Sequence, residues 1–262
     1  MKVLIFGLPG SGKTYLANEL MKLLGDRAEW INADDVRKEC DDWDFSKEGR
    51  ERQLQRMRIL AEAVVDKGKI AICDFVCPLN EYRELFDADF TIFVDTIDES
   101  RFEDTNKLFQ RPPSRDYPGA ADYTVTEHRE DYDAREIVWD LVDDKFDVRA
   151  PTAQMLGRFQ PWHNGHQALF DRLLEKEGQV AIMVRDQAQD DDNPFHVLDV
   201  CQHLRLHLAE YAGKVRIFAA PNITRIGYGR DVGYAIEQEH FDAEIEEISA
   251  TKIREIMRNA DD

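Results

Sequence analysis

The sequence predicts an α/β protein made of two doubly wound parallel-sheet domains. Three observations lead to this fold class. Apolar runs typical of buried strands alternate with amphipathic helical stretches, which is the pattern of parallel sheets flanked by helices. The length of 262 residues suits two domains of common size. Pro151 interrupts the pattern after an acidic helical segment, so we expect domains at residues 1–149 and 152–262.

The expected strands are short apolar runs, and the expected helices lie between most of them. The strand runs are residues 3–6, 70–73, 91–94, 154–159, 180–184 and 215–219. The acidic helical segment covers residues 131–146. Residues 190–192 are all aspartate and are expected to form a solvated loop.

Composition and charge restrict the class of partner. Hydrophobic residues make up 43% of the chain and aromatic residues 10%, which favours globular folding throughout. The formal net charge of −19 disfavours nucleic acid, because a binding face would have to oppose the field of the whole protein. Small anionic substrates remain compatible, since physiological salt screens the acidic surface beyond a distance of about 8 Å.

The cysteines and the apolar runs lead us to expect a cytoplasmic protein. The four cysteines show no paired spacing of the kind found in zinc sites, so we expect free thiols. The chain has no basic-then-apolar leader and no run near the ~20 apolar residues that a membrane span needs. We therefore expect no membrane partner, and a homo-oligomer remains open.

A phosphate-binding loop is expected at residues 7–14, which fit the pattern GxxxxGK[ST] between a strand-like run and a helix-like one. In such a loop backbone N–H groups converge on phosphate oxygens, and Lys13 reaches the β- and γ-phosphates of ATP. The Thr14 hydroxyl is offered to Mg²⁺. The expected nucleotide-binding residues of the loop are Gly7, Pro9, Gly10, Ser11, Gly12, Lys13 and Thr14.

A second, chemically unrelated signature lies in the C-terminal half. Residues 157–166 end in two histidines that bracket a glycine, an HxGH arrangement. Residues 248–254 contain Ser-x-Thr before a helix-like stretch. Together these segments resemble the paired signatures of the HxGH nucleotidylyltransferase superfamily, which includes nicotinamide-mononucleotide (NMN) adenylyltransferases and small cytidylyltransferases. The resemblance implies a small Rossmann-like nucleotidylyltransferase domain.

This resemblance also implies a reaction without a covalent intermediate. An anionic acceptor such as a phosphate would attack the α-phosphate of a nucleoside triphosphate, and pyrophosphate would leave. His163, His166 and Arg254 would stabilise the phosphates as charge builds. The other implied nucleotide-binding residues are Gly157, Arg158, Phe159, Gly165, Ser249 and Thr251. Residues 157–161 favour an adenylyltransferase whereas the short segment favours a cytidylyltransferase, so the second nucleotide is ATP or CTP.

Three segments of the N-terminal half resemble adenylylsulfate (APS) kinases. Residues 32–37 are similar to the DGDNxR segment of that family, residues 45–50 to FSxEDR, and residues 74–78 to xFISP. The resemblance implies a P-loop kinase domain in which Asp34 orients or deprotonates the acceptor hydroxyl and helps to hold Mg²⁺. It further implies that Arg37 and Arg50 hold anionic groups of the acceptor and that Phe75 stacks on its adenine.

Departures from the family pattern bear on the acceptor. Cys77 stands where the family has serine, Gln53 where it has asparagine and Gln55 where it has arginine. Residues 104–109 only loosely resemble the KGLY motif of the family's lid. The missing arginine at position 55 argues against APS itself as the acceptor. Asp74 is either a second carboxylate that orients Mg²⁺ or an aspartate of a strand-end turn.

The two halves together predict a bifunctional transferase. We expect an ATP-dependent kinase acting on a small hydroxyl compound and a nucleotidyltransferase acting on a phosphorylated small molecule, in consecutive steps. The alternatives are a ribosylnicotinamide kinase with NMN adenylyltransferase, a sulfate-activation pair that makes PAPS, and a nucleotide-sensing regulator with little turnover. Intact Lys13, Asp34 and His163 argue against the regulator.

Overall fold

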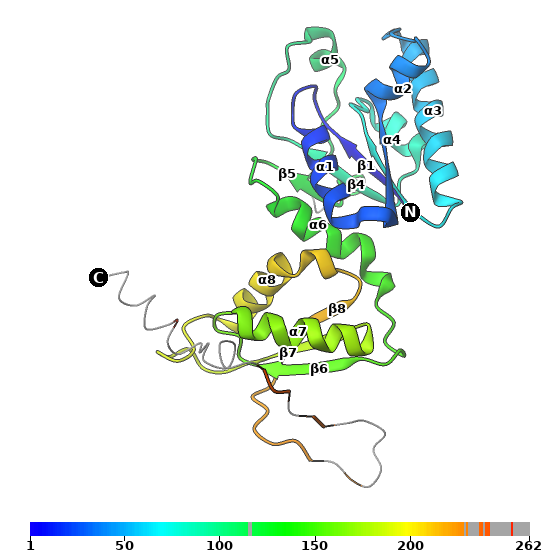
Figure 1. The fold of residues 1–262 in the computed structure, drawn as a ribbon. Coiled ribbons are helices and arrows are strands. Elements are labelled where there is room, and N and C mark those ends of the chain that lie inside the picture. Colours follow the sequence, from blue (N-terminus) through cyan, green and yellow to red (C-terminus); the bar gives the residue numbers. More distant parts are fainter. Residues whose placement is uncertain (115–116, 228, 230–235, 238, 242–252, 254–262) are drawn as a thin grey trace. The chain divides into compact units, whose positions relative to one another are not determined.

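The computed structural model describes residues 1–114, 117–227, 229, 236–237, 239–241 and 253. The chain divides into two compact units, unit 1 (Met1–Leu141) and unit 2 (Val142–Asp262). The expected domain boundary near residues 149–152 therefore falls inside unit 2, and its role as a domain boundary stays a prediction. Figure 1 shows the helices and strands of both units.

Unit 1 is built on one five-stranded parallel sheet with the strand order β2-β3-β1-β4-β5. Its strands are β1 (Lys2–Phe6), β2 (Ala28–Asn32), β3 (Ile70–Asp74), β4 (Phe90–Val94) and β5 (Tyr123–Val125). Its helices are α1 (Lys13–Leu24), α2 (Ala33–Glu39), α3 (Lys47–Val65), α4 (Asn80–Phe86), α5 (Glu103–Leu108) and α6 (Tyr132–Val142), with a 3₁₀ turn η1 (Gly25–Arg27).

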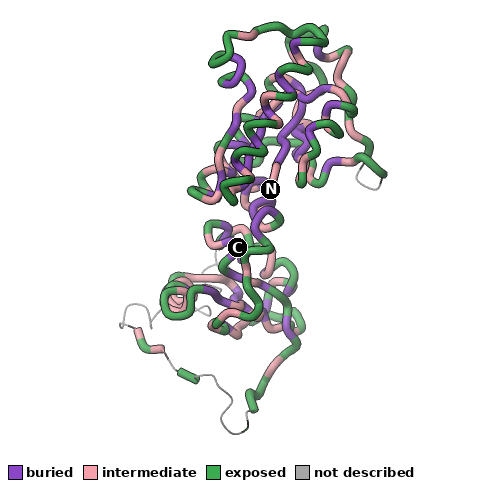
Figure 2. Tube along the Cα trace, turned by 90° about the vertical axis from the view of Figure 1, so that its right-hand side faces the viewer, coloured by how far each residue is buried: buried purple, intermediate pink, exposed green. Residues whose placement is uncertain are grey.

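The central strand β1 is covered on both faces. Leu4 and Phe6 belong to a core cluster that includes Met57 of α3 and Phe86 of α4. Val3 and Ile5 are also fully buried, and they point to the opposite face because successive side chains of a strand alternate. This arrangement explains the uninterrupted apolar run in the sequence. Figure 2 shows the buried residues of unit 1 following its strands.

The sheet order places the phosphate-binding loop at a crevice. Strands β2 and β3, which follow β1 in the chain, lie on one side of β1, and β4 and β5 lie on its other side, so the direction of winding reverses at β1. Ligands of open parallel sheets bind at such a point, beyond the carboxyl ends of the strands. Asp74 ends β3 and Asn32 ends β2, in direct register with one another. Both residues therefore lie beside the loop that follows β1.

Unit 2 contains a three-stranded parallel sheet with the order β6-β7-β8. Its elements are β6 (Ala153–Gly157), α7 (Asn164–Glu177), β7 (Val180–Arg185), α8 (Val197–His207) and β8 (Val215–Ala220), with 3₁₀ turns η2 (Asp143–Lys145) and η3 (Ala209–Tyr211). Both α7 and α8 pack against strands of this sheet. The α/β class with parallel sheets is thus confirmed, while the complete Rossmann-like domain stays a prediction.

Three expectations about elements differ from the structure. Strands β2 and β5 were not expected, because each lies at an edge of the sheet and lacks a continuous apolar run. The strand expected to reach Phe159 ends at Gly157. Phe159 has a left-handed φ of 52°, and its ring folds back to where a Cβ of Gly157 would lie. The chain therefore turns immediately after β6.

None of the helices within the described residues is long and apolar enough to cross a membrane.

Candidate functional site

The loop between β1 and α1 has a backbone that only glycine tolerates at key positions. Gly10 and Gly12 have φ values of 88° and 95°, in the left-handed region. A Cβ at Gly12 would overlap the ring of His128, and one at Gly7 would overlap the carbonyl oxygen of Val94. Gly12 is also the N-cap of α1, so the first backbone N–H groups of that helix are directed at the loop.

Lys13 is buried in this loop, with 8% of its surface exposed. Its Nζ atom donates a hydrogen bond of 2.8 Å to the Leu8 carbonyl. Burial lowers the pKa of Lys13 to about 8, against the opposing effect of the negative charges of Asp74 and Asp34. An ammonium group with so few water neighbours attracts an anionic phosphate more strongly than an exposed lysine does.

Asp74 connects three elements around the loop. Its Oδ2 accepts a hydrogen bond of 2.8 Å from the Thr14 hydroxyl, and its Oδ1 accepts one of 2.8 Å from the Trp30 indole. The amide of Asn32 donates to both oxygens, at 3.0 and 3.1 Å. Burial raises the pKa of Asp74, and the bonds from Trp30, Thr14 and Asn32 oppose that rise. The carboxylate thereby fixes the direction of the Thr14 hydroxyl.

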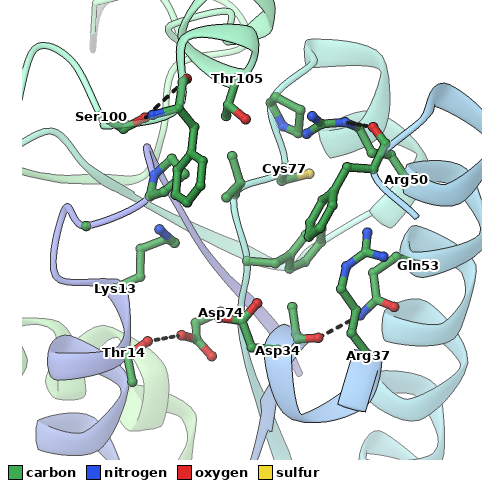
Figure 3. A pocket seen from close by; sticks show the side chains of 18 of the residues that line it. Lys13, Thr14, Asp34, Arg37, Arg50, Gln53, Asp74, Cys77, Ser100 and Thr105 are labelled. Carbon is green, nitrogen blue, oxygen red and sulfur yellow. Dashed lines mark hydrogen bonds between the residues drawn. The ribbon is translucent and has the colours of Figure 1, made fainter. Parts of the chain in front are cut away.

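Asp34 reaches the same place through the N-terminus of α2. The side-chain oxygen of Asn32 caps this helix by accepting from the backbone N–H groups of Asp34 and Asp35, at 3.0 and 3.1 Å. Asp34 is therefore held in the first turn and lines a cavity together with Lys13 and Thr14. Figure 3 shows Lys13, Asp34 and Asp74 around this cavity, with Ser100 and Thr105 across from them.

The cavity has a volume of about 800 Å³ and is lined from several parts of unit 1. These parts include the phosphate-binding loop, the carboxyl ends of β2 and β3, the helices α2 and α3, the segment between these two helices, and α5 with the segment leading into it. Its mouth carries aromatic side chains that are partly open to solvent. They are Trp43, Phe45 and Phe102. The cavity is thus large enough for a nucleotide phosphate chain and a second small molecule.

The two arginines expected to hold the acceptor both line the cavity, and both have partners within the chain. Arg37 is 5% exposed, and its Nη1 donates to the carbonyls of Asp42 and Asp44 at 2.9 and 3.0 Å. Arg50 pairs with Asp104 at 3.2 Å. Any anionic group that binds these arginines must therefore share them with the protein.

The remaining acceptor-side residues divide between the cavity and the surface. Phe75 lines the cavity and packs edge to face on Phe86, with ring centroids 5.4 Å apart. Cys77 is also in the wall, and burial raises the pKa of its thiol far above the usual range. Gln55 instead is exposed and lines a separate shallow groove beside Leu85. Position 55 therefore lies outside the cavity wall, and the expectation that its glutamine disfavours APS stays a prediction.

Two contributors to this site were missed in the sequence. Trp30 and Asn32 both bond to Asp74, yet they belong to β2, the edge strand that its mixed composition concealed. Gln53, noted only as a departure from a family pattern, donates to the Ala33 carbonyl at 3.0 Å and so ties α3 to the start of α2. Had a strand been expected just before residue 33, the sequence would have predicted Asn32 at the carboxyl end of that strand, beside the phosphate-binding loop.

The residues expected to hold Mg²⁺ fit that ion. Mg²⁺ keeps several waters and takes only one or two protein ligands besides substrate phosphates. Thr14 and Asp34 face the cavity, and Asp74, which accepts from three side chains, suits orientation of Thr14 better than direct ligation. Among the described residues, no cluster of three or more His, Cys, Asp and Glu side chains is arranged to hold a metal ion by itself.

In unit 2 the two histidines of the HxGH segment lie together. His163 caps α7, its Nδ1 accepting from the Gly165 N–H at 3.1 Å, and its ring stacks on that of His166 with centroids 3.7 Å apart. Phe159 and Trp162 enclose His166, with centroid distances of 5.0 and 5.3 Å. Burial, and then the neighbouring His163, lower the pKa of His166 to about 4. His166 is therefore neutral at pH 7.

The other expected residues of this half are only partly described. Gly157 ends β6, and Arg158 donates to the Asn193 side chain at 3.3 Å. Ser249, Thr251 and Arg254 lie outside the described residues. The structure therefore brings His163, Gly165 and His166 to the N-terminus of one helix, and a shared site with the C-terminal segment stays a prediction.

A parallel sheet with a glycine-rich loop after its central strand, a buried lysine and a helix N-terminus is the arrangement of a P-loop phosphate-binding site. Comparison with known proteins agrees. Residues 1–112 match the family model described as adenylylsulphate kinase. The resemblance of the N-terminal region to APS kinases is thus confirmed.

Individual relatives match the same region. A probable adenylyl-sulfate kinase of Aeropyrum pernix is 38% identical over 87 residues, which are 32% of this chain and 48% of the relative. The bifunctional enzyme NodQ of Rhizobium meliloti is 32% identical over 116 residues, which are 40% of this chain and 18% of the relative. This chain thus spans less than half the length of these curated relatives. Among solved structures, the APS kinase of Mycobacterium tuberculosis in complex with AMPPNP and APS aligns with a TM-score of 0.45 at 24% identity, covering 54% of this chain and 96% of that one.

Proposed function

We propose that the chain is a bifunctional cytoplasmic transferase. Unit 1 transfers the γ-phosphoryl group of ATP to a hydroxyl of a small, anionic acceptor, and unit 2 transfers a nucleotidyl group from a second nucleoside triphosphate to a phosphorylated small molecule. The observation that carries the first activity is the meeting of Lys13, Thr14 and Asp34 at one cavity, with Asp74 fixing Thr14. The family match of residues 1–112 supports ATP as its substrate.

The kinase reaction needs positioning and neutralisation of charge more than covalent chemistry. Asp34 orients the acceptor hydroxyl and takes its proton, while the acceptor oxygen bonds to the γ-phosphorus and the bond to the β-phosphate oxygen breaks. Lys13 and the N-terminus of α1 balance the charge on the leaving ADP. Thr14 and Asp34 would hold Mg²⁺, which supplies a further positive charge at the β- and γ-phosphates.

The acceptor is the point on which this proposal departs from the curated relatives. The relative from Aeropyrum pernix is described as a probable adenylyl-sulfate kinase, and the wall of this cavity departs from the APS-kinase pattern at Cys77 and Gln53. Arg37 and Arg50 are both engaged by the chain itself. We therefore propose an acceptor other than APS, with APS as the reference compound in every assay.

The kinase is tested with a panel of hydroxyl acceptors, including APS, and mass spectrometry of the products. Lys13→Ala is expected to reduce phosphoryl transfer by on the order of 10²-fold or more, since it removes a cation from the transition state. Pyrophosphate release by unit 2 should stay unchanged. Joint loss of both activities in a folded variant would contradict two separate catalytic centres.

The second activity is supported by the stacked histidines at the N-terminus of α7, directly after β6. A neutral His166 can donate a hydrogen bond to a phosphate oxygen that gains charge as the acceptor attacks the α-phosphate. The bond between the α- and β-phosphates then breaks and pyrophosphate leaves.

This second activity is measured as pyrophosphate release with ATP and with CTP. His166→Ala is expected to lower kcat by roughly 10² to 10³-fold with little change in nucleotide affinity. His203→Ala is the control, because this histidine lies on a different helix, α8, where it contacts Phe195. An unchanged kcat in His166→Ala would exclude a nucleotidylyltransferase of the HxGH type.

A further inference from the structure

The segment between α2 and α3 alternates acidic and aromatic residues, and the structure separates the two kinds. Trp43 and Phe45 line the cavity, with 51% and 53% of their surfaces exposed. Asp42 and Asp44 instead contact arginines of α3. We call residues 42–46 the acceptor wall. A wall without helix or strand hydrogen bonds needs other contacts to hold its aromatic rings in place.

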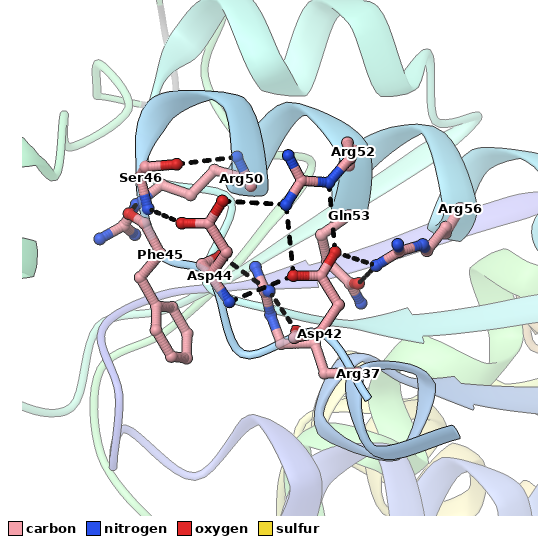
Figure 4. A network of polar contacts seen from close by, with 10 residues as sticks. Arg37, Asp42, Asp44, Phe45, Ser46, Arg50, Arg52, Gln53 and Arg56 are labelled. Carbon is pink, nitrogen blue, oxygen red and sulfur yellow. Dashed lines mark hydrogen bonds and ion pairs between the residues drawn. The ribbon is translucent and has the colours of Figure 1, made fainter. Parts of the chain in front are cut away.

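The acidic side of the acceptor wall supplies many of these contacts. Asp42, whose side chain is 12% exposed, contacts Arg56 at 2.8 Å and Arg52 at 3.2 Å. Arg52 extends to Asp44 at 2.9 Å, and the Asp44 carboxylate accepts from the Ser46 N–H at 2.9 Å. Asp42 also accepts from the Asp44 N–H at 3.2 Å. Figure 4 shows this network joining the wall to α3.

The cavity side is held by the two arginines that the family resemblance assigned to the acceptor. Arg37 donates to the carbonyls of Asp42 and Asp44, and its guanidinium carbon lies 4.6 Å from the centroid of the Phe45 ring. Arg50 donates to the Phe45 carbonyl at 2.8 Å. The carbonyls of Asp42, Asp44 and Phe45 thus accept hydrogen bonds from guanidinium groups. Phe45 is held at its ring by Arg37 and at its carbonyl by Arg50.

From these contacts we propose that Asp42 is a positioning residue for the acceptor, which acts by holding Trp43 and Phe45 in the acceptor wall and the wall against Arg37. The proposal rests on the kinase activity proposed for unit 1. Asp42 touches no reacting atom in this scheme. It supplies the charge that anchors two arginines of a rigid helix, and the aromatic faces on the other side of the wall then meet the acceptor at a fixed place.

The contacts indicate which kinetic constant should change. Arg52 and Arg56 hold the pKa of Asp42 well below its usual range, so the carboxylate is ionised at neutral pH. Asp42→Asn keeps the shape but removes the charge that both arginines share. The phosphate-binding loop and Asp74 are held by separate contacts, at Leu8, Thr14 and Trp30. The acceptor site should therefore weaken while the ATP site stays intact.

The experiment measures steady-state kinetics of the full chain with the best acceptor found in the panel. Asp42→Asn is expected to raise the KM for the acceptor by roughly tenfold, the scale of one charge-assisted hydrogen bond, with the KM for ATP and kcat unchanged within twofold. Glu62→Gln is the matched control, since it removes an exposed ion pair with Arg58 on the same helix. Arg52→Gln, which leaves the Asp42 to Arg56 pair in place, should give a smaller rise and serves if Asp42→Asn does not fold.

A second measurement needs no substrate. Acrylamide quenching of Trp43, assigned by difference from Trp43→Phe, should increase in Asp42→Asn and stay unchanged in Glu62→Gln. An acceptor KM within twofold of the parent, or an equal rise in the KM for ATP, would overturn the positioning role. If no acceptor is phosphorylated by the parent protein, the kinase proposal fails, and unchanged quenching would then separately refute the account of the acceptor wall.

Discussion

Replacement of Asp74 by asparagine should slow phosphoryl transfer and destabilise unit 1 by comparable free energies. Asp74 is 3% exposed, and its two oxygens accept hydrogen bonds from Trp30, Asn32 and Thr14. The indole of Trp30 can only donate, so it requires an oxygen opposite it. Asparagine offers one oxygen where aspartate offers two. Its amide group then faces Thr14, whose hydroxyl must accept a hydrogen bond in place of donating one.

The expected magnitudes follow from this rearrangement. A hydrogen bond to a charged group contributes about 1.5–3 kcal/mol, so the free energy of unfolding of unit 1 should fall by about that amount. The hydroxyl of Thr14 would also be turned away from the Mg²⁺ position. Loss of one preorganised contact in a transition state costs roughly 2.7 kcal/mol or more, which corresponds to about a 10²-fold fall in kcat.

The assay is a double-mutant cycle with Thr14→Ala, read by steady-state kinetics at saturating ATP and by urea unfolding. If Asp74 acts through the hydroxyl, Asp74→Asn should cost little further activity once that hydroxyl is gone. Thr14→Ser retains the hydroxyl and should keep the full sensitivity to Asp74→Asn. An equal loss of kcat in the parent and in Thr14→Ala would refute the coupling of these two side chains.

Three further changes give separate tests. Gly12→Ala should abolish kinase activity and lower the free energy of unfolding by about 1–3 kcal/mol, because Gly12 has a φ of 95° and a Cβ there would meet a histidine ring. Gly25→Ala should lower stability in urea melts without loss of activity, because Gly25 has a φ of 54° but open space around it. Burial lowers the pKa of His166 from 6.5 to about 4, so the unfolded chain binds this proton at a higher pH than the folded chain does. The free energy of unfolding should therefore be full above pH 6.5 and fall by up to about 3 kcal/mol as the pH drops to 4. Denaturation curves of His166→Asn at both pH values should lack this loss. Asp104→Asn should free Arg50 from an exposed ion pair that contributes about 0–1 kcal/mol, and so lower the KM for anionic acceptors by up to about fivefold. An equal fall in the KM for uncharged acceptors would show that Asp104 does not compete with the acceptor for Arg50.

The parts of the fold that could be predicted are those with a local signal. The apolar run of β1 and the helical spacing of α1 are contiguous, so their alternation predicted a parallel sheet. Strand β2 carries Glu29 and Asn32 and is half-exposed, because it lies at the edge of the sheet. It forms a strand because it pairs with β3, and the pattern of its five residues does not reveal that pairing.

The candidate site shows the same division. The sequence by itself determined the chemistry of the phosphate-binding loop, because Gly12, Lys13 and Thr14 are neighbours whose spacing already fixes a glycine-dependent turn into a helix. It also supplied the HxGH pair, whose two histidines lie at the N-cap and in the first turn of α7. Such motifs act through local geometry, which the order of residues specifies.

Only the tertiary structure decided which distant residues join these motifs. In the structure Trp30 and Asn32 donate hydrogen bonds to Asp74, and Arg50 forms an ion pair with Asp104. Gln55 lies on the surface outside the cavity. The physical reason is that these contacts depend on strand register and on the packing of α3 against strands and neighbouring helices, which the whole core sets. A motif specifies which groups are present, but the sheet order specifies which of them meet.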